Sequence, residues 1–255
     1  MKFEHQFKVD TLSVYISKTE KDLAQISAEI THKHLLQVLE EKEEARVILA
    51  TGNSQLQFLD ALIATQKIDW NRITLFHLDE YLGINEKHQA SFCYYLKNKV
   101  EKRVYPKRFH YIRGNTLEPV EECERYTELL QERPIDLCCL GIGTNGHLAF
   151  NEPAVAKFDD SYWVKLVRLE EETRQVQVNQ GHFSHLNEVP KYAITLTIPM
   201  ILLSRKIICL ALGINKAKIV ETMLKKHIDT HCPASILRKH SDADLFLEQN
   251  SANLL

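Results

Sequence analysis

Short apolar runs alternate along the chain with segments of helical periodicity, and this alternation constrains the fold more than any other feature. Five runs are mostly apolar and end at glycine or polar residues: 46–50, 73–78, 135–140, 206–212 and 243–247. Helical patterns fill much of the sequence between them: 19–42, 56–63, 121–132 and 215–226. Such runs are typical of strands buried on both faces of a parallel sheet. The chain therefore predicts a three-layer α/β fold, a doubly wound, mostly parallel sheet with helices on both faces.

Polar and glycine-rich stretches follow the predicted strand ends, at 51–54, 79–81, 141–152 and 213–216. Ligands of doubly wound sheets bind beyond the carboxyl ends of the strands, so we expect a site at this edge. The sequence has no internal repeat and no long linker, and we expect one domain spanning 1–255. Residues 153–190 are less regular and rich in charged and amide side chains, and we interpret them as a lid or an excursion over the site.

Charge and cysteine content limit the class of protein. The chain has 32 basic and 34 acidic side chains and a net charge of −2, which gives no general attraction to nucleic acid or to an anionic membrane. Met1 to Asp10 lacks the apolar core of a secretory signal, and no apolar stretch approaches the ~18 residues of a membrane span. The six cysteines contain no C-x-x-C pair, and several lie in apolar runs as reduced core thiols do. We therefore expect a cytoplasmic protein.

Two classes of chemistry lack their sequence signatures. The chain has 12 histidines, but it contains no H-E-x-x-H or comparable ligand set, so we predict no metal and no cofactor. It also contains no G-x-S-x-G elbow, and no cysteine lies beside a plausible base. Covalent hydrolase chemistry is therefore disfavoured.

Thr51-Gly52-Asn53-Ser54 lies between a predicted strand and a predicted helix. Small residues there allow backbone N–H groups and the helix N-terminus to approach a phosphate. The alternative is a plain turn in which Ser54 caps the helix. Lys216 begins another predicted helix, where a cation is unfavourable unless an anion is nearby; the alternative is a solvated surface lysine. If the loop and Lys216 converge, they form a phosphate clamp.

Two further strand-end stretches carry candidate proton-transfer groups. Asp79 offers a rigidly placed carboxylate, which acts as a general base if its pocket is partly dry; the alternative is a cap or a surface turn. The stretch 141–153 holds three glycines, which indicate a tight backbone close to another group, followed by His147 and Glu152. An imidazole oriented by a carboxylate transfers protons near neutral pH, although a loop histidine without such a role is the alternative.

At these residues the chain resembles the glucosamine-6-phosphate deaminase/isomerase family, which is related to the 6-phosphogluconolactonases. The matching stretches keep the family's order and cover most of residues 45–220: LATGNS at 49–54, FHLDEYLG at 76–83, HQASFCYY at 88–95, GIGTNGHLAFNEP at 141–153, VPKYAIT at 189–195 and LGINK at 212–216. The part G-x-N-G-H-x-A-F-N-E-P is specific to the family. The lactonases are similar around the glycines but continue as G-H-T-A-S, whereas Leu148 follows His147 in this chain.

The resemblance implies a Rossmann-like fold of the sugar-phosphate isomerase type and a substrate that is a small sugar phosphate. It implies an enzyme of amino-sugar breakdown that releases ammonia and a keto-sugar phosphate. Thr51–Ser54 and Lys216 then hold the 6-phosphate, His147 opens the pyranose ring, and Asp79 moves the C2 proton to C1. Neither nucleic acid nor a membrane is an implied partner.

Asn145 and Glu152 are implied to position His147. Many members of the family have an aspartate at the place of Asn145, which leaves Glu152 as the only anionic partner. The family's lid arginine has no clear counterpart, since collinear placement falls on Asn179, with Arg168 and Arg174 as displaced candidates. The family's allosteric basic cluster has no match either, so we predict no activator. The sequence leaves the oligomeric state open, a homo-oligomer included.

Three functions are consistent with these residues. The first is the deaminase/isomerase reaction on glucosamine-6-phosphate. The second is an isomerase or lactonase reaction on a different sugar phosphate, such as 6-phosphogluconolactone. The third is a sugar-phosphate sensor without catalysis, which the presence of Asp79, His147 and Glu152 disfavours.

Overall fold

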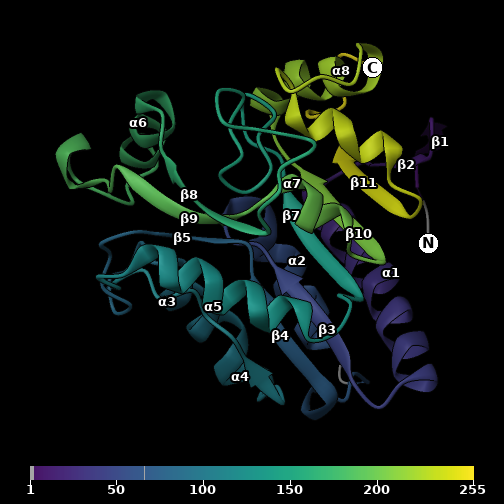
Figure 1. Ribbon diagram of the computed structural model, residues 1–255. Helices are drawn as coiled ribbons and strands as arrows, with labels where there is room; N and C mark the ends of the chain where they lie inside the picture. The colour runs from purple at the N-terminus through teal and green to yellow at the C-terminus, as the bar shows by residue number, and fades with distance from the viewer. Residues whose placement is uncertain (1–2, 66) are drawn as a thin grey trace.

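The computed structural model describes residues 3–65 and 67–255, and its centre is an eight-stranded sheet (Figure 1). The strands of this sheet are β1 (His5–Val9), β2 (Leu12–Ser17), β3 (Ala45–Leu49), β4 (Ile73–His77), β6 (Arg108–Phe109), β7 (Leu137–Gly141), β10 (Lys206–Ala211) and β11 (Ala243–Glu248). Their order is β1-β2-β11-β10-β7-β3-β4-β6. Among the described strand pairs of this sheet, only β1 runs antiparallel to its neighbour. The predicted mostly parallel α/β sheet is confirmed.

Side chains alternate along β7 between two apolar layers, which is why this run is hydrophobic throughout. Leu137 and Cys139 join the layer formed with the first two helices, whereas Cys138 and Leu140 join the layer on the opposite face. In Figure 1, α2 lies behind the sheet and α5 in front of it. The helices of the first layer are α1 (Glu20–Glu41) and α2 (Asn53–Ala64), and those of the second are α5 (Pro119–Gln131), α7 (Ile198–Leu202) and α8 (Ala217–Lys225).

The predicted helices occur with small shifts of their ends. α1 begins at the start of the predicted segment 19–42, where the Thr19 hydroxyl caps the helix by accepting a hydrogen bond from the Asp22 N–H at 3.1 Å. The helix predicted at 215–226 starts two residues later, after a 3₁₀ turn at Ile214–Lys216. The hairpin of β1 and β2 was not predicted. The remaining short helical turns are Trp70–Arg72, Lys97–Glu101, α4 (Lys102–Val104), Leu186–Glu188 and Pro233–Lys239.

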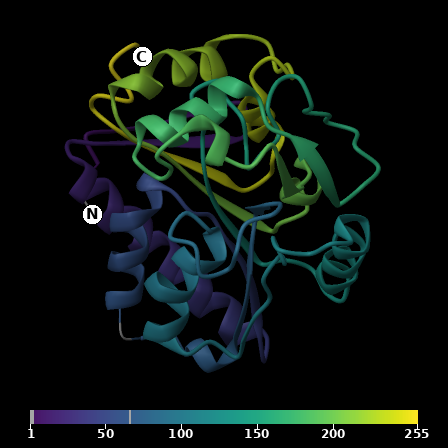
Figure 2. The same cartoon turned by 90° about the vertical axis from the view of Figure 1, so that its left-hand side faces the viewer.

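A second, three-stranded antiparallel sheet extends from the main one. It consists of β5 (Asp79–Tyr81), β9 (Tyr192–Leu196) and β8 (Val164–Arg168), in this order. The sequence predicts 79–81 as a strand end and not as a strand of another sheet, so this part of the prediction is wrong. α3 (Phe92–Leu96) and α6 (Glu171–Asn179) accompany the small sheet. α6 lies beside β8 and β9 in Figure 1 and faces the viewer in Figure 2.

The topology fixes where a ligand binds. From β3 the chain proceeds to β4 on one side, and from β7 it proceeds to β10 on the other. The direction of winding therefore reverses between β3 and β7, and such a switch point leaves a crevice at the carboxyl ends of the strands. Within the described ranges, none of the helices has the length and apolar character that crossing a membrane requires. The six cysteines, all of them in the described part, are buried free thiols.

Candidate active site

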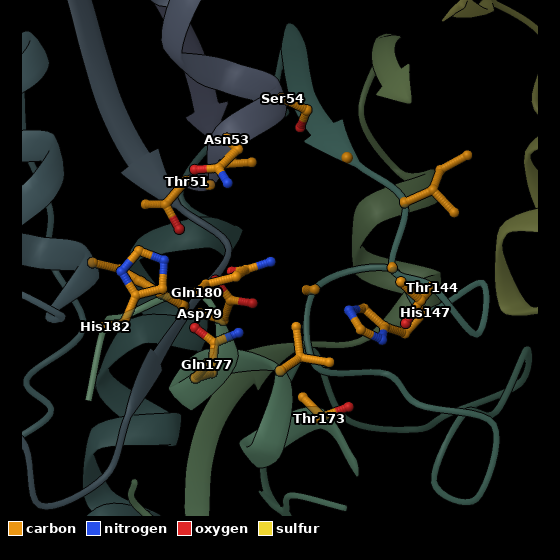
Figure 3. A pocket seen from close by; sticks show the side chains of 18 of the residues that line it. Thr51, Asn53, Ser54, Asp79, Thr144, His147, Thr173, Gln177, Gln180 and His182 are labelled. Carbon is orange, nitrogen blue, oxygen red and sulfur yellow. The ribbon is translucent and has the colours of Figure 1, made fainter. Parts of the chain in front are cut away.

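A cavity of about 650 Å³ opens at the carboxyl ends of β3, β4, β7 and β10. Its wall includes four of the predicted elements: the loop Thr51–Ser54, Asp79, His147 and Lys216. Figure 3 shows Asp79 and His147 on opposite sides of the cavity, with the Thr51–Ser54 loop near its top. Loops that are far apart in the sequence thus surround one space.

The Thr51–Ser54 loop presents the N-terminus of α2 to the cavity. Gly52 is the N-cap, with φ 98° and ψ 171°, a conformation that a residue with a side chain rarely adopts. Ser54 lies inside the helix, so the alternative that it caps a plain turn is wrong. Because glycine has no side chain to cap the helix, the first N–H groups of this 12-residue helix remain available to an anion.

Lys216 supplies a positive charge on the wall of the same cavity. It is the N-cap residue of α8 and follows Gly213, whose φ is 88°. Burial lowers the pKa of Lys216 to about 8, because a desolvated ammonium group is unfavourable. Among the described residues Lys216 has no ion-pair partner, and a partly desolvated lysine of this kind at a helix start is a favourable place for an anionic ligand.

Asp79 is the first residue of β5 and lies two residues after β4 ends at His77. Strand alternation sends the neighbouring Glu80 to the other side. The Glu80 carboxylate accepts hydrogen bonds from its own turn and from the start of α3: Tyr81 N at 2.9 Å, Ser91 Oγ at 2.7 Å, Phe92 N at 3.1 Å and Cys93 N at 2.8 Å. Asp79 itself is 8% exposed and faces the cavity. Burial, with a smaller effect of the Glu80 charge, raises the pKa of Asp79 to about 8.

His147 is held by Asn145. The Asn145 side-chain oxygen lies 2.7 Å from Nδ1 of His147 and also accepts the His147 backbone N–H at 3.2 Å. An amide oxygen only accepts, so Nδ1 carries the proton and Nε2 is the basic nitrogen. Burial and the charge of Lys216 lower the pKa of His147 to about 4, so the imidazole is neutral at pH 7. The ring packs on Gly143, where an added Cβ would lie 2.2 Å from Nε2.

The structure describes no hydrogen bond between Glu152 and the imidazole, although the resemblance implies that Glu152 positions His147. Glu152 is 1% exposed, and its Oε2 accepts the backbone N–H of Glu170 at 3.0 Å, next to the start of α6. Its Oε1 has no hydrogen-bond partner among the described residues. Burial raises the pKa of Glu152. In this structure Asn145 orients His147, and Glu152 ties the glycine-rich loop to α6.

Residues of the segment 153–190 form one wall of the cavity: Thr173, Val176, Gln177, Asn179, Gln180 and His182. Within the described ranges, Arg168 and Arg174 are absent from this wall. Arg174 is buried and donates to the carbonyls of Leu186 and Val189. The sequence did not single out Gln177, Gln180 and His182, for which the amide-rich composition was the only signal.

No group of three or more histidine, cysteine, aspartate or glutamate side chains within 3–65 and 67–255 is arranged to hold a metal ion. The cavity instead combines a helix N-terminus, one lysine, a neutral imidazole and a carboxyl group of raised pKa. Such a set binds an anion and moves protons.

The raised pKa of Asp79 predicts how its replacement changes stability with pH. The folded-state pKa lies above the ordinary value of 3.8, so folding of the wild-type chain becomes less favourable as pH rises from about 4 to about 8. Asp79→Asn removes this penalty. We expect its gain in unfolding free energy to grow over this range, to the order of 2–5 kcal/mol at pH 8. Urea unfolding of both proteins at several pH values measures this gain. If the difference in unfolding free energy between variant and wild type stays constant with pH, the carboxyl group of Asp79 is not buried and protonated.

Known proteins share both this sequence and this fold. Residues 18–246 match the family model described as glucosamine-6-phosphate isomerases/6-phosphogluconolactonase. A glucosamine-6-phosphate deaminase of Lactobacillus delbrueckii subsp. bulgaricus is 37% identical over 207 residues, which are 81% of this chain and 86% of that protein. One of Bacillus cereus is 31% identical over 243 residues, 95% of this chain and 89% of that protein.

Solved structures place the chain in the same group. A protein described as a monomeric glucosamine-6-phosphate deaminase superposes with a TM-score of 0.87 at 33% identity, covering 95% of this chain and 99% of its own. A 6-phosphogluconolactonase of Thermotoga maritima reaches 0.76 at 21% identity, over 93% and 99% of the two chains. The second likeness concerns the fold alone. By sequence and by fold, this chain belongs to the glucosamine-6-phosphate isomerase/6-phosphogluconolactonase family.

Proposed function

We propose that the protein is a glucosamine-6-phosphate deaminase, which converts this amino-sugar phosphate and water to a keto-sugar phosphate and ammonia. The observation that carries the proposal is the placement of Asp79 and His147 on opposite sides of one cavity, beside an uncapped helix N-terminus and Lys216 (Figure 3). Relatives of 31–37% identity bear the deaminase name, whereas the lactonase neighbour is only 21% identical. A lactonase is therefore the less favoured function.

The 6-phosphate binds at the start of α2 and to Lys216. N–H groups at a helix N-terminus point at an anion and favour its charge, and the ammonium group of Lys216 adds a point charge that accepts several phosphate orientations. A bound dianion also stabilises the protonated form of this half-buried lysine. The wall formed by α6 covers the sugar. We therefore propose that the segment 153–190 acts as a lid over the bound substrate.

His147 opens the pyranose ring. Because its imidazole is neutral, Nε2 accepts the proton of the C1 hydroxyl and returns it to the ring oxygen, so the C1–O5 bond breaks and an aldehyde forms. Asn145 keeps Nδ1 protonated and the ring in place for both transfers. Packing on Gly143 restricts the ring further.

Asp79 then transfers a proton between neighbouring carbons. The aldehyde makes the C2–H bond acidic, and the carboxylate removes this proton and returns it to C1 through an enediol-type enolamine. The product carries a C2=N group, to which water adds before ammonia leaves, so the whole reaction is hydrolytic. The amino group on C2 is basic, and its cationic form next to Asp79 favours the ionised carboxylate that the reaction needs.

The cysteines bear on where this reaction takes place. All six are unpaired and buried, as is typical of proteins from reducing compartments. We therefore place the enzyme in the cytoplasm. As a separate point, we propose that residues 1–255 form one domain.

Asp79→Asn tests the role of the carboxylate. We expect the wild-type protein to release ammonia from glucosamine-6-phosphate and the variant to lose about 1,000-fold in kcat, since an amide cannot accept the C2 proton. Ammonia release measures the overall reaction, and incorporation of solvent deuterium at C1 of the product measures the proton transfer. Asp69→Asn is the matched control, because Asp69 is exposed and outside the cavity wall. An Asp79→Asn variant with wild-type turnover overturns the assignment.

The pH dependence follows from the two groups of altered pKa. Below pH 8 the free enzyme holds Asp79 mainly protonated, and above pH 8 Lys216 loses its charge. We therefore expect kcat/KM to rise about tenfold per pH unit between 6 and 7, to peak near 8 and to fall beyond it. The rising limb of kcat should lie at lower pH, because the bound amine favours the carboxylate. A kcat/KM that is flat from pH 6 to 8 rules out this account.

A further inference from the structure

The side chain of Gln55 lies directly behind the anion-binding loop and belongs to none of the groups considered so far. Gln55 is 0% exposed, although glutamine is a polar side chain that is rarely fully buried. It occupies the first turn of α2, and its backbone N–H donates to the Gly52 carbonyl at 3.0 Å. A buried amide needs partners for its polar atoms. In Gln55 the amide nitrogen has such partners, whereas Oε1 has none among the described residues.

Both hydrogens of the Gln55 amide nitrogen are used. Nε2 lies 3.1 Å from Oγ of Ser54 and 3.3 Å from the carbonyl oxygen of Leu140, at the end of β7. The carbonyl can only accept, which identifies the facing atom as the amide nitrogen. Gln55 therefore links the N-terminus of α2 to β7.

This contact fixes the direction of the Ser54 hydroxyl. A hydroxyl has one hydrogen to donate and lone pairs to accept. Because the Gln55 amide donates to Oγ, the hydrogen of Ser54 is left free. Ser54 is part of the cavity wall (Figure 3), and Gly141 of the same wall lies so close that a Cβ added to it would be 2.9 Å from the Ser54 Oγ. The free hydrogen is thereby available to a group inside the cavity.

We propose that Gln55 is a positioning residue that turns Ser54 into a dedicated hydrogen-bond donor to the phosphate of the substrate. The proposal rests on the proposed function in that it takes a sugar phosphate as the ligand. A residue that accepts from Ser54, in contrast, would point the hydroxyl hydrogen away from the anion. The chemistry of one buried side chain thus sets the affinity of the anion site without touching the ligand.

A double-mutant cycle tests this coupling. Gln55→Met keeps the size of the side chain and removes the amide, and Ser54→Ala removes the hydroxyl. We expect each variant to raise KM for glucosamine-6-phosphate about 5- to 20-fold with kcat within about twofold of wild type, and the double variant to lose no more than either alone. A purely structural role for Gln55 would give losses that multiply. Multiplying losses, or an unchanged KM in Gln55→Met, overturn the proposal.

Controls separate this proposal from other causes. Gln57→Met makes the same change on an exposed position of α2 and should leave KM unchanged. If circular dichroism shows that Gln55→Met does not fold, the isosteric Gln55→Glu replaces it. Its carboxylate should raise KM more than Ser54→Ala does. An equal or smaller rise contradicts the proposal. If the wild type releases no ammonia, the proposed function fails. Calorimetric binding of inorganic phosphate to the same variants then still decides whether Gln55 and Ser54 act together.

Discussion

The candidate active site depends on keeping a carboxylic acid buried at the point where two sheets meet. Asp79 follows the parallel strand β4 and begins the antiparallel strand β5, and the Leu196 N–H donates to the carbonyl of Leu78 at 2.9 Å to hold this join. A buried carboxyl without a cationic partner costs free energy, which the apolar layers on both faces of the main sheet offset. Glu80 is fully hydrogen-bonded on the opposite side, so only one of the two acids faces the cavity. The unfavourable burial of Asp79 is the source of its raised pKa, on which its proposed role as a base depends.

The other groups of the cavity are arranged around this carboxyl by the same edge of the sheet. The N-terminus of α2 and Lys216 favour negative charge, and both lie at strand ends on either side of the switch point between β3 and β7. Burial and the charge of Lys216 keep His147 neutral, which is the state that the proposed ring opening requires of a group that first accepts a proton. The positively charged anion site therefore lies beside a neutral imidazole, His147, and beside Asp79, a carboxyl group that ionises only at raised pH. Burial and a neighbouring charge set the protonation state of both side chains.

Much of the fold and of the cavity wall could be predicted from the sequence. The central strands are covered on both faces, so they read as apolar runs, and the residues that follow each run lie at one edge of the sheet. The small sheet could not be predicted in this way, because Asp79 pairs with Thr195 and a three-residue strand has too little alternation to detect. The position of Glu152 depends on a turn in which Ala149 has φ 52° and the Asn151 N–H donates to the carbonyl of Leu148. Spacing along the chain carries no information on the path of this turn, so it could not show that the Glu152 carboxylate accepts from the Glu170 N–H.

A crystal structure with 2-amino-2-deoxyglucitol 6-phosphate, an open-chain analogue without the reactive carbonyl, tests the central claim most directly. We predict that its phosphate lies within hydrogen-bond distance of the first turn of α2 and of Lys216, with C2 facing the Asp79 carboxyl group and C1 toward His147. An analogue whose phosphate lies away from α2, or whose C2 faces neither side chain, would show that the two proton-transfer groups do not act on one substrate in this cavity.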